Sequence, residues 1–280
     1  MTNMPAPKIA LTAIVLSHNE ADNLPRCLEA LADCEEVVVV DDGSTDASVQ
    51  VAEAAGARVV HHPFTSFADQ RNWAMQQAGS DTGWTLHLDA DEVVTPAGLA
   101  EIQSLLPTLN TTQIGGVPRK IILDDRWLKH SADYPVYVPR LVHRDGPRFR
   151  MGGHGEIIDA APETWVYLRE PLLHYAFSKG WGEWYAKHER YAQAEAQRIR
   201  EGHLPSGLTG LFARDRAQRR TAWRAWSYRL PARPWLRFVY AYVWRRGFLD
   251  GGPGWKFCRA MMQYERMINR ALRDAHASQT

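Results

Sequence analysis

The chain has 280 residues, of which 45% are hydrophobic and 23% charged, and its formal net charge is +1. This composition is that of an ordinary globular protein, which excludes a disordered or fibrous chain, and the length fits one large domain or two small ones. The three cysteines lack the spacing of metal ligands, which favours a reducing, cytoplasmic location. We expect no signal peptide and no membrane-spanning helix, because no run approaches about 18 apolar residues.

The first hundred residues alternate between short apolar runs and amphipathic segments. Strands are predicted at residues 9–16, 37–40, 58–61 and 84–88, and helices at residues 21–31, 46–55, 66–77 and from Thr95-Pro96 onward. Ser66 and Asp69 have the spacing of a helix-capping box. This order of elements predicts an α/β fold with a mostly parallel sheet and helices on both faces.

After residue 110 the pattern changes, because Gly, Pro and Asp interrupt the apolar runs. Short strands are predicted at residues 117–123, 136–138 and 141–143, and a helical region begins near residue 177. The short strands would extend the sheet and supply loops. We therefore expect three parts, comprising residues 1–110, 111–176 and 177–280.

Polar clusters follow three of the predicted strands at the point where each strand ends. Val37–Val40 runs into Asp41-Asp42-Gly43-Ser44, and Leu86-His87-Leu88 runs into Asp89-Ala90-Asp91-Glu92. Ser17-His18-Asn19-Glu20 ends the first strand in the same way. Because open α/β sheets bind ligands at the carboxyl ends of their strands, we expect a nucleotide at one carboxylate set and a metal-bound phosphate at the other.

The Asp89-x-Asp91 spacing suits a divalent cation that bridges a diphosphate, since Mg²⁺ and Mn²⁺ prefer oxygen ligands. Asp91 is the expected direct ligand, and Asp89 is expected to contact the ribose or a metal-bound water. An acidic turn before a helix capped by Thr95 is the simpler explanation, but the preceding strand and the Asp41-Asp42 pair favour the metal site. One aspartate of that pair is expected to be structural, because Gly43 and Ser44 favour a turn.

Four motifs occur in an order that resembles family 2 glycosyltransferases, and among them the bacterial lipopolysaccharide-core type of glucosyltransferase. They are Ser17–Glu20, Val40–Asp46, Asp69–Asn72 and Leu88–Glu92, within a match of roughly residues 8–105. A weaker similarity continues at Gly153–Glu156, Leu173–Tyr175 and Gly247–Gly251. The resemblance implies a GT-A fold, a nucleotide-diphosphate sugar donor with a UDP-sugar expected, and an inverting, metal-dependent transfer.

The resemblance also implies a role for each part and for individual residues. Residues 1–110 would bind the nucleotide sugar, residues 111–176 would hold the acceptor and the catalytic base, and residues 177–280 would form a helical extension. The expected donor contacts are Ser17, Asn19, Glu20, Asp41, Asp42, Arg71, Asn72 and Asp89. The expected ligands of Mg²⁺ or Mn²⁺ are Asp89, Asp91 and His174. His174 has an alternative role, which is packing between Leu173 and Tyr175.

Inversion by single displacement needs one general base, which deprotonates the acceptor hydroxyl, and no covalent nucleophile. Glu156, in a glycine-rich segment, is the predicted base, and His154 is expected to orient it or to contact the acceptor. The related motif has an adjacent His-Glu pair, whereas here Gly155 intervenes. Asp159 and Glu163 are therefore the alternative bases, and an exposed loop carboxylate is the non-catalytic explanation for Glu156.

Residues 214–246 contain ten arginines and one acid, Asp215, with tryptophan and tyrosine interleaved. This pattern is typical of an interfacial helix on anionic lipid, so we expect peripheral attachment to the inner face of a bacterial inner membrane. A solvated basic face over buried aromatic residues is the alternative. No nucleic-acid motif accompanies the segment, so no nucleic-acid partner is expected. Pro231 and Pro234 predict two helices with a bend, followed by a turn at residues 247–254 and a final helix.

The predicted function is transfer of a hexose from a nucleotide sugar to a hydroxyl group of a lipopolysaccharide core or related surface glycolipid. Transfer to a polyprenyl phosphate is an alternative that would need no strong base, because that acceptor is already anionic. A nucleotidyltransferase would instead release diphosphate. The non-enzymatic alternative is a nucleotide-sugar- or lipid-binding scaffold, against which the intact acidic motifs argue.

Overall fold

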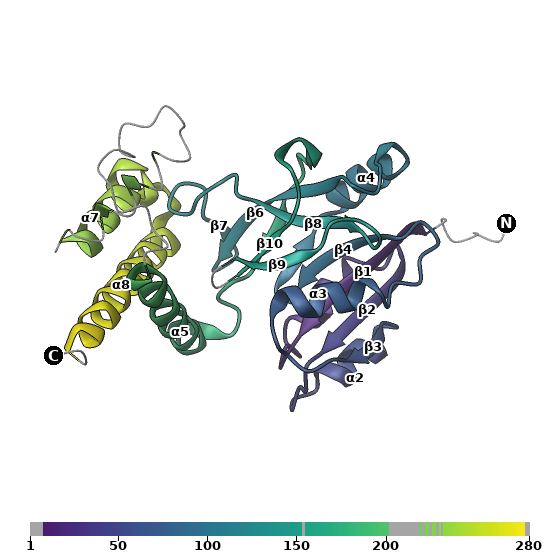
Figure 1. The fold of residues 1–280 in the computed structure, drawn as a ribbon, viewed down its shortest axis with the longest axis horizontal. Coiled ribbons are helices and arrows are strands. Elements are labelled where there is room, and N and C mark those ends of the chain that lie inside the picture. Colours follow the sequence, from purple (N-terminus) through teal and green to yellow (C-terminus); the bar gives the residue numbers. More distant parts are fainter. Residues whose placement is uncertain are drawn as a thin grey trace. The chain divides into compact units, whose positions relative to one another are not determined.

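The computed structural model describes residues 8–152, 155–201, 219, 222, 223, 226, 227, 230 and 232–277. The chain divides into two compact units (Figure 1). Unit 1 contains residues up to Ile122 and Tyr134–Ser178, and unit 2 contains Leu123–Asp133 and the residues from Lys179 onward. The expected boundary between residues 110 and 111 therefore lies within unit 1, and the one at residue 176 lies near its end.

Unit 1 is built on a mixed sheet whose central strand order is β3-β2-β1-β4-β8-β6-β12-β5. The strands are β1 (Ile9–Ser17), β2 (Cys34–Asp41), β3 (Arg58–His61), β4 (Trp84–Asp89), β5 (Glu92–Val94), β6 (Ile114–Leu123), β8 (Tyr137–His143), β11 (Trp165–Tyr167) and β12 (Leu172–His174). Strands β3, β2, β1 and β4 are parallel, whereas β8 is antiparallel to both β4 and β6. A separate antiparallel hairpin consists of β9 (Phe149–Gly152) and β10 (Gly155–Ile158).

Helices cover both faces of the sheet, as the alternating pattern predicts. Helices α1 (Leu24–Glu29), α2 (Ser48–Ala54) and α4 (Pro96–Leu105) contribute to one core cluster, and α3 (Phe67–Met75) contributes to the other together with β9 and β10. Short 3₁₀ turns lie at Leu106–Thr108 and Pro162–Thr164. The sheet is thus buried on both sides, which explains why its parallel strands are continuous apolar runs.

The beginning of α3 has half of the predicted capping box. The Ser66 hydroxyl accepts a hydrogen bond from the Asp69 amide at 3.1 Å. The Asp69 carboxylate accepts from the Thr65 hydroxyl at 2.6 Å and lies 3.0 Å from His62 Nε2. Asp69 therefore holds the loop before the helix.

The prediction of two separate strands at residues 136–138 and 141–143 was wrong, because β8 is continuous. Its register shifts at Pro139 and Arg140, since Leu141 pairs with Gly115 while Pro139 pairs with Gly116. This shift is a β-bulge, one of the few places where a strand accommodates proline. The bulge also determines which face of the sheet Arg140 occupies.

Unit 2 contains β7 (Arg126–Trp127), α5 (Gly180–Arg200), α7 (Arg233–Val239), a π-helical turn (Tyr240–Trp244), a 3₁₀ turn (Gly247–Asp250) and α8 (Gly251–Ala277). Helix α8 starts earlier than predicted, because proline is tolerated in a first helical turn. Helices α5 and α8 meet where His188 stacks on Trp184 and its ring contacts Tyr264 edge to face.

The segment before residue 134 is joined to the beginning of α8 by Asp250. This buried carboxylate accepts hydrogen bonds from the amides of His130 and Ser131 at 2.9 and 2.7 Å, and from the Ser131 hydroxyl at 2.6 Å. Unit 2 is therefore discontinuous in sequence. None of the helices formed by the described residues has the length and apolar composition needed to cross a membrane.

Candidate active site at the carboxyl edge of the sheet

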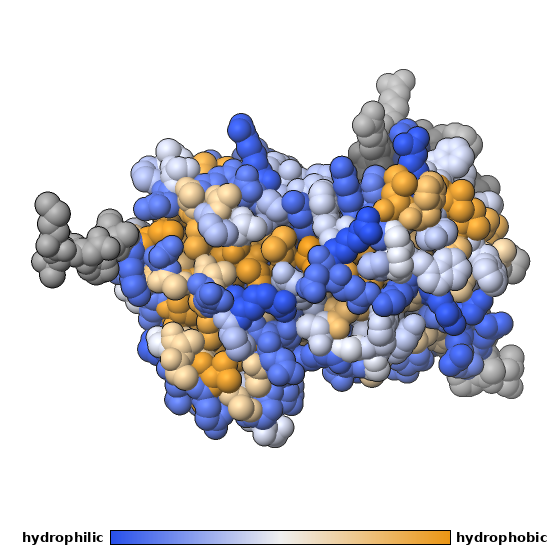
Figure 2. Space-filling view, turned by 180° about the vertical axis from the view of Figure 1, so that it is seen from behind, coloured by the Kyte–Doolittle hydropathy of each residue, from blue (hydrophilic) through white to orange (hydrophobic). Residues whose placement is uncertain are grey.

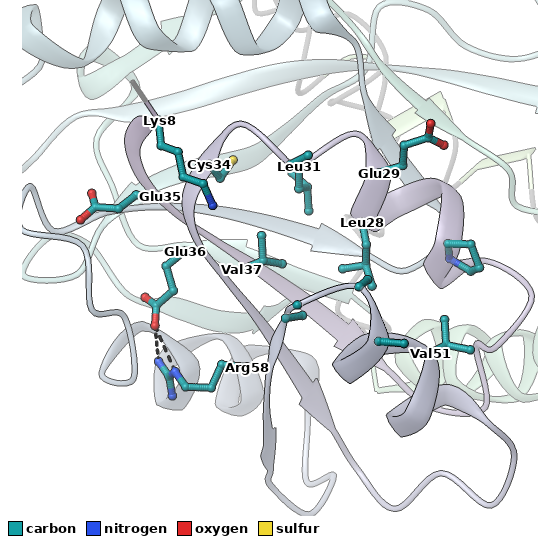
Figure 3. A pocket seen from close by; sticks show the side chains of 16 residues that line it. Lys8, Leu28, Glu29, Leu31, Cys34, Glu35, Glu36, Val37, Val51 and Arg58 are labelled. Atoms are coloured by element: carbon teal, nitrogen blue, oxygen red, sulfur yellow. Dashed lines mark hydrogen bonds and ion pairs between the residues drawn. The ribbon is translucent and has the colours of Figure 1, made fainter. Parts of the chain in front are cut away.

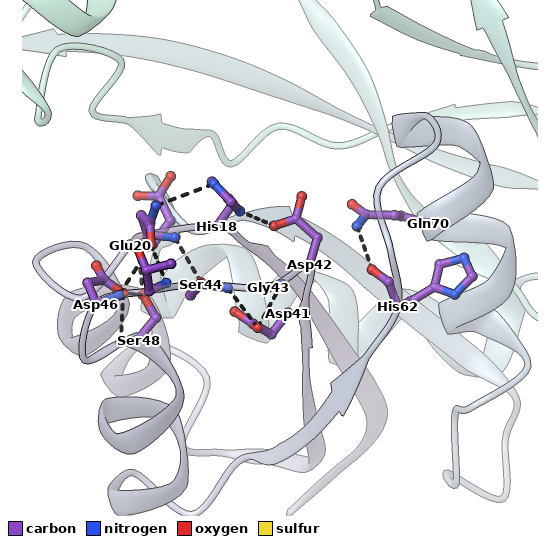
Figure 4. A network of polar contacts seen from close by, with 12 residues as sticks. His18, Glu20, Asp41, Asp42, Gly43, Ser44, Asp46, Ser48, His62 and Gln70 are labelled. Carbon is purple, nitrogen blue, oxygen red and sulfur yellow. Dashed lines mark hydrogen bonds and ion pairs between the residues drawn. The ribbon is translucent and has the colours of Figure 1, made fainter.

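The carboxyl ends of β1 and β2 meet in a network of polar contacts (Figure 4). Asn19 has a left-handed backbone conformation with φ of 53°, and its side-chain oxygen accepts a hydrogen bond from the Thr45 amide at 2.8 Å. Asp41 is buried, and its Oδ2 accepts from the amides of Gly43 at 3.0 Å and Ser44 at 3.1 Å. The loop after β2 is therefore shaped by side chains from the ends of both strands.

Asp41 uses only part of its hydrogen-bonding capacity on this loop. Its Oδ1 and the hydroxyl of Ser17, its neighbour across β1 and β2, are buried and have no hydrogen-bond partner among the described residues. Burial alone would raise the pKa of Asp41, but hydrogen bonds from Ser44 and Gly43 outweigh it and lower the pKa. Asp41 is thus an ionised carboxylate with one structural oxygen and one oxygen left to accept a hydrogen bond.

The other predicted donor residues of this edge have local partners as well. Asp42 is more exposed than Asp41 and pairs with Nδ1 of His18. The Glu20 amide donates to the hydroxyl of Ser48 at 2.7 Å, and its carboxylate accepts from the Asn23 amide group at 2.7 Å. The structure thus brings Ser17, Asn19, Glu20, Asp41 and Asp42 together.

Two buried arginines and three carboxylates form a second cluster beyond the end of β4. Arg71 of α3 donates from Nη2 to Asp89 Oδ1 at 2.6 Å and from Nε to Glu156 Oε1 at 3.0 Å. Arg140 of β8 donates to the same Glu156 oxygen at 3.1 Å, to Asp89 Oδ2 at 3.2 Å and to Glu92 Oε1 at 2.8 Å. Glu92 and Arg71 are 0% exposed, so these charges depend on each other for stabilisation.

Arg140 and Glu92 were not among the predicted site residues. Arg140 interrupts the apolar segment 136–142, and a charge inside a buried strand requires partners of opposite charge. Glu92 directly follows the Asp89-x-Asp91 motif and also accepts from the Asp89 amide at 3.2 Å. Arg140 within an apolar segment could therefore have indicated a buried ionic cluster, although no neighbouring residue in the sequence identified its partners.

Glu156, the predicted base, is held by the hairpin of β9 and β10. Burial alone would raise the pKa of Glu156, but the guanidinium groups of Arg71 and Arg140 outweigh it and lower the pKa. Asn72 fixes the hairpin, because its side chain donates to the Phe149 carbonyl at 2.8 Å and accepts from the Phe149 amide at 2.9 Å. His154 lies outside the described residues.

Asp91 and His174 lie side by side next to this cluster, since His174 of β12 pairs with Glu92 of β5. Asp91 Oδ2 and His174 Nε2 are 3.2 Å apart, and both side chains are partly exposed. Two neighbouring ligands of an octahedral Mg²⁺ ion lie about 3 Å apart, so this spacing fits a shared cation. Among the described residues, no group of three His, Cys, Asp or Glu side chains is arranged to hold a metal. Asp89 is instead engaged by the two arginines, and phosphate oxygens and water would have to complete the shell.

A family model for glycosyl transferase family 2 matches residues 12–175 of this chain. The chain belongs to glycosyl transferase family 2. Lipopolysaccharide core biosynthesis glycosyltransferase LpsC of Rhizobium meliloti is 34% identical over 108 residues, which are 37% of this chain and 38% of LpsC. An uncharacterized glycosyltransferase of Rickettsia bellii is 30% identical over 117 residues, which are 41% of this chain and 39% of that protein. The alignments therefore span about two-fifths of each relative.

Among solved structures, that of Staphylococcus aureus TarS 1-349 matches with a TM-score of 0.39 and 15% identity, over 95% of this chain and 91% of that one. The predicted family is thus confirmed, and the sheet with helices on both faces confirms the predicted α/β fold. The family model covers the strands that carry Asp41, Asp89 and His174, so the polar edge lies within the family region.

Unit 1 also has a hollow of about 660 Å³ at the amino end of β2 (Figure 3). Its lining is mostly apolar, with Leu28 on α1, Leu31 just after α1 and Val51 on α2. The Glu36–Arg58 ion pair lies at its rim. The polar clusters described above follow the carboxyl ends of the strands, so this hollow is separate from the candidate active site.

Proposed function

We propose that the chain transfers a hexose from a UDP-sugar to a hydroxyl group of a lipopolysaccharide core or related surface glycolipid, with inversion at the anomeric carbon and with bound Mg²⁺ or Mn²⁺. The observation that carries the proposal is that three features meet at one edge of the sheet. They are the polar loop held by Asp41, the Asp91–His174 pair and the largely buried carboxylate of Glu156. The similarity to LpsC supports the acceptor class.

The nucleoside would bind at the ends of β1 and β2. Asp41 Oδ1 and the Ser17 hydroxyl are the buried oxygens without partners among the described residues, and an oxygen of this kind accepts a hydrogen bond from a base N–H or a ribose hydroxyl. Asn19, Glu20 and Asp42 would border the same pocket. Ionisation of Asp41 strengthens such a hydrogen bond.

The diphosphate would bind between this loop and the second cluster. Asp91 and His174 would hold the cation, and Asp89 would contact the ribose or a cation-bound water. When bound, the ion neutralises the charge that develops on the departing diphosphate. Nη1 of Arg71 and Nε of Arg140 are buried donors for which the described residues supply no acceptor, so they remain available to a phosphate oxygen.

Glu156 would accept the proton of the acceptor hydroxyl as that oxygen attacks the anomeric carbon. Its lowered pKa keeps the carboxylate ionised at neutral pH, which is the form that a base requires. The alternative base Asp159 is exposed and paired with Arg150 at 2.8 Å, and Glu163 is exposed. This contrast in burial favours Glu156.

The lipid part of the acceptor would lie at the inner face of the bacterial inner membrane, to which the chain would attach peripherally. The segment proposed for this attachment is 214–246, of which the structure describes residues 232–246 and a few single positions. Trp235 and Trp244 are 57% and 82% exposed there, which supports contact with an apolar phase.

The donor site is tested by thermal unfolding with UDP-, GDP- and dTDP-sugars, each with and without Mn²⁺. We expect one nucleotide class to raise the melting temperature in a metal-dependent way, because a ligand that binds only the native state stabilises it. Asp91→Ala should abolish the shift, whereas Asp145→Ala, which changes an exposed carboxylate, should retain it. Absence of any shift at donor concentrations far above a plausible Kd would exclude the proposed donor site.

The acceptor class is tested by measuring release of nucleoside diphosphate with a lipopolysaccharide-core glycolipid and, separately, with a polyprenyl phosphate. With the glycolipid, Glu156→Gln should lower kcat by about 10²- to 10⁴-fold, the usual contribution of a general base. Turnover of the polyprenyl phosphate alone, with near-normal activity of Glu156→Gln, would contradict the proposed acceptor.

A further inference from the structure

Three aromatic side chains form a row on the sheet of unit 1. Tyr137 of β8 and Tyr167 of β11 meet edge to face with ring centroids 4.7 Å apart, and Tyr167 stacks on Trp165 at 5.9 Å with an interplanar angle of 22°. Tyr167 is 56% exposed and Tyr137 is 38% exposed, whereas Trp165 is half-buried. The row therefore presents aromatic surface to solvent from a rigid sheet rather than from a loop.

The strand between these rings makes room for them. Gly116 of β6 pairs with Tyr167 on one side and with Pro139, at the bulge of β8, on the other. A Cβ atom at Gly116 would lie 2.9 Å from a ring atom of Trp165 and 3.2 Å from a ring atom of Tyr167. Any side chain at this position would therefore push the rings out of their places.

The aromatic row lies on the same face of the sheet as the predicted base. Trp165 packs against the core cluster that contains Phe149 and Ile158 of the β9–β10 hairpin. Glu156 and Ile158 are two residues apart on β10, so their side chains lie on the same side of that strand. The hairpin thus connects Glu156 with the row.

The row is also separated along β8 from Arg140, which bonds the predicted base. Tyr137 precedes Arg140 by three residues on β8, which is roughly 10 Å along a strand, and Arg140 bonds Glu156 directly. A sugar ring on Tyr137 would thus be displaced along β8 from the position of Arg140. A ligand on the row would therefore be a unit next to the one that carries the reacting hydroxyl.

We propose that Tyr137, Tyr167 and Trp165 form an acceptor subsite that binds a pyranose ring of the glycan adjacent to the reacting hydroxyl. This inference rests on the proposed function and adds to it the part of the acceptor that is recognised. A pyranose has one face of C–H groups, which packs on an aromatic ring, and a rim of hydroxyls, which the two phenol groups can bind. Exposed tyrosines held by a sheet pay little entropy on binding, because a tyrosine has few rotatable bonds.

The subsite is tested by saturation-transfer NMR on the full chain, with irradiation of aromatic protein resonances. The probes are methyl α-D-glucopyranoside and methyl α-D-mannopyranoside, and open-chain sorbitol is the control ligand. We expect saturation to be transferred to the pyranose C–H protons of at least one glycoside, and little to the protons of sorbitol. A Tyr137→Ala/Tyr167→Ala variant should lose most of this signal, whereas Phe64→Ala, which removes an exposed aromatic ring elsewhere on unit 1, should retain it.

The same variants are compared in the transfer assay with a glycolipid acceptor. The double alanine variant should raise the acceptor KM roughly tenfold with a smaller change in kcat, and Tyr167→Phe should stay near wild type because it keeps the ring. Equal saturation in wild type and the double variant, or none in wild type, would overturn the subsite. A change of oligomeric state in the double variant without loss of glycoside signal would assign the row to a protein contact and would also overturn it.

Failure of the subsite and failure of the proposed function give different results. The melting-temperature shift caused by the donor sugar is recorded on the same samples and does not depend on the aromatic row. A donor shift without glycoside saturation rejects the subsite alone. Absence of the donor shift from the wild-type protein rejects the donor site on which the proposed function depends.

Discussion

Arg140 donates hydrogen bonds to three carboxylates that come from separate parts of the chain, and it is 2% exposed. Replacing it with methionine would leave the fully buried Glu92 without its cation. We expect Arg140→Met to lower the free energy of unfolding by about 3–5 kcal/mol, the usual cost of breaking a buried ion pair from one side. Urea unfolding at pH 7 measures this loss.

The matched control for Arg140 is Arg150→Ala. Arg150 also donates to a carboxylate, Asp159 at 2.8 Å, but both side chains are more than half exposed. Its removal should change the free energy of unfolding by less than about 1 kcal/mol. If the two variants were equally stable, the cluster around Glu92 would not depend on Arg140.

At the scale of secondary-structure elements, Glu36 joins three strands. Its carboxylate accepts hydrogen bonds from the Thr12 hydroxyl on β1 at 2.9 Å, from Arg58 on β3 at 2.6 Å and from the Gly79 amide at 2.6 Å. Burial alone would raise the pKa of Glu36, but the bonds to Arg58, Gly79 and Thr12 outweigh it and lower the pKa below its ordinary value. The folded state therefore binds the ionised form preferentially.

Because the folded-state pKa of Glu36 is depressed, its stabilisation is present above the unfolded-state pKa and is lost as the pH falls through the folded-state pKa. Glu36→Gln should therefore lower the free energy of unfolding by about 1–2 kcal/mol at pH 7, and the gap to wild type should shrink below about pH 4.3. Urea unfolding from pH 3 to 7 measures the gap, with the exposed Glu53→Gln as control. A gap that stayed constant down to pH 3 would show that ionisation of Glu36 is not its source.

The elements differ in how well local sequence predicts them. Strands β1, β3 and β4 are apolar runs that end in polar residues, and each lies within one residue of its predicted bounds. The sequence pattern predicted two strands in place of β8, because proline usually interrupts a strand. The bulge that accommodates Pro139 leaves no local pattern in the sequence. The partners of Glu156 were missed for another reason. Its contact with Arg71 spans 85 residues, and such pairing depends on the topology of the sheet.

At the scale of the whole molecule, unit 2 exposes several large apolar side chains, and apolar side chains that gather on a surface often mark an interaction site. Figure 2 shows apolar side chains gathered on part of its surface. The exposed large side chains of α7 and the following π-helical turn are Trp235, Leu236, Val239, Tyr240, Val243 and Trp244. They recur at spacings of four residues, so they form two adjacent ridges on one helical face. Arginines of the same segment, such as exposed Arg246, would supply the charge that anionic head groups attract.

This face predicts binding to an anionic bilayer, which co-sedimentation with phosphatidylcholine vesicles with and without phosphatidylglycerol measures. We expect wild type to bind the anionic vesicles more tightly, and less so at high salt. Trp235→Ser/Trp244→Ser should weaken binding by roughly tenfold or more, because each tryptophan loses the gain from apolar burial. Phe64→Ser, which removes an aromatic residue of similar exposure from unit 1, should bind as wild type does. Equal binding by the double variant would show that these tryptophans do not contact the bilayer. Dissociation of an oligomer without loss of vesicle binding would assign the face to a protein contact.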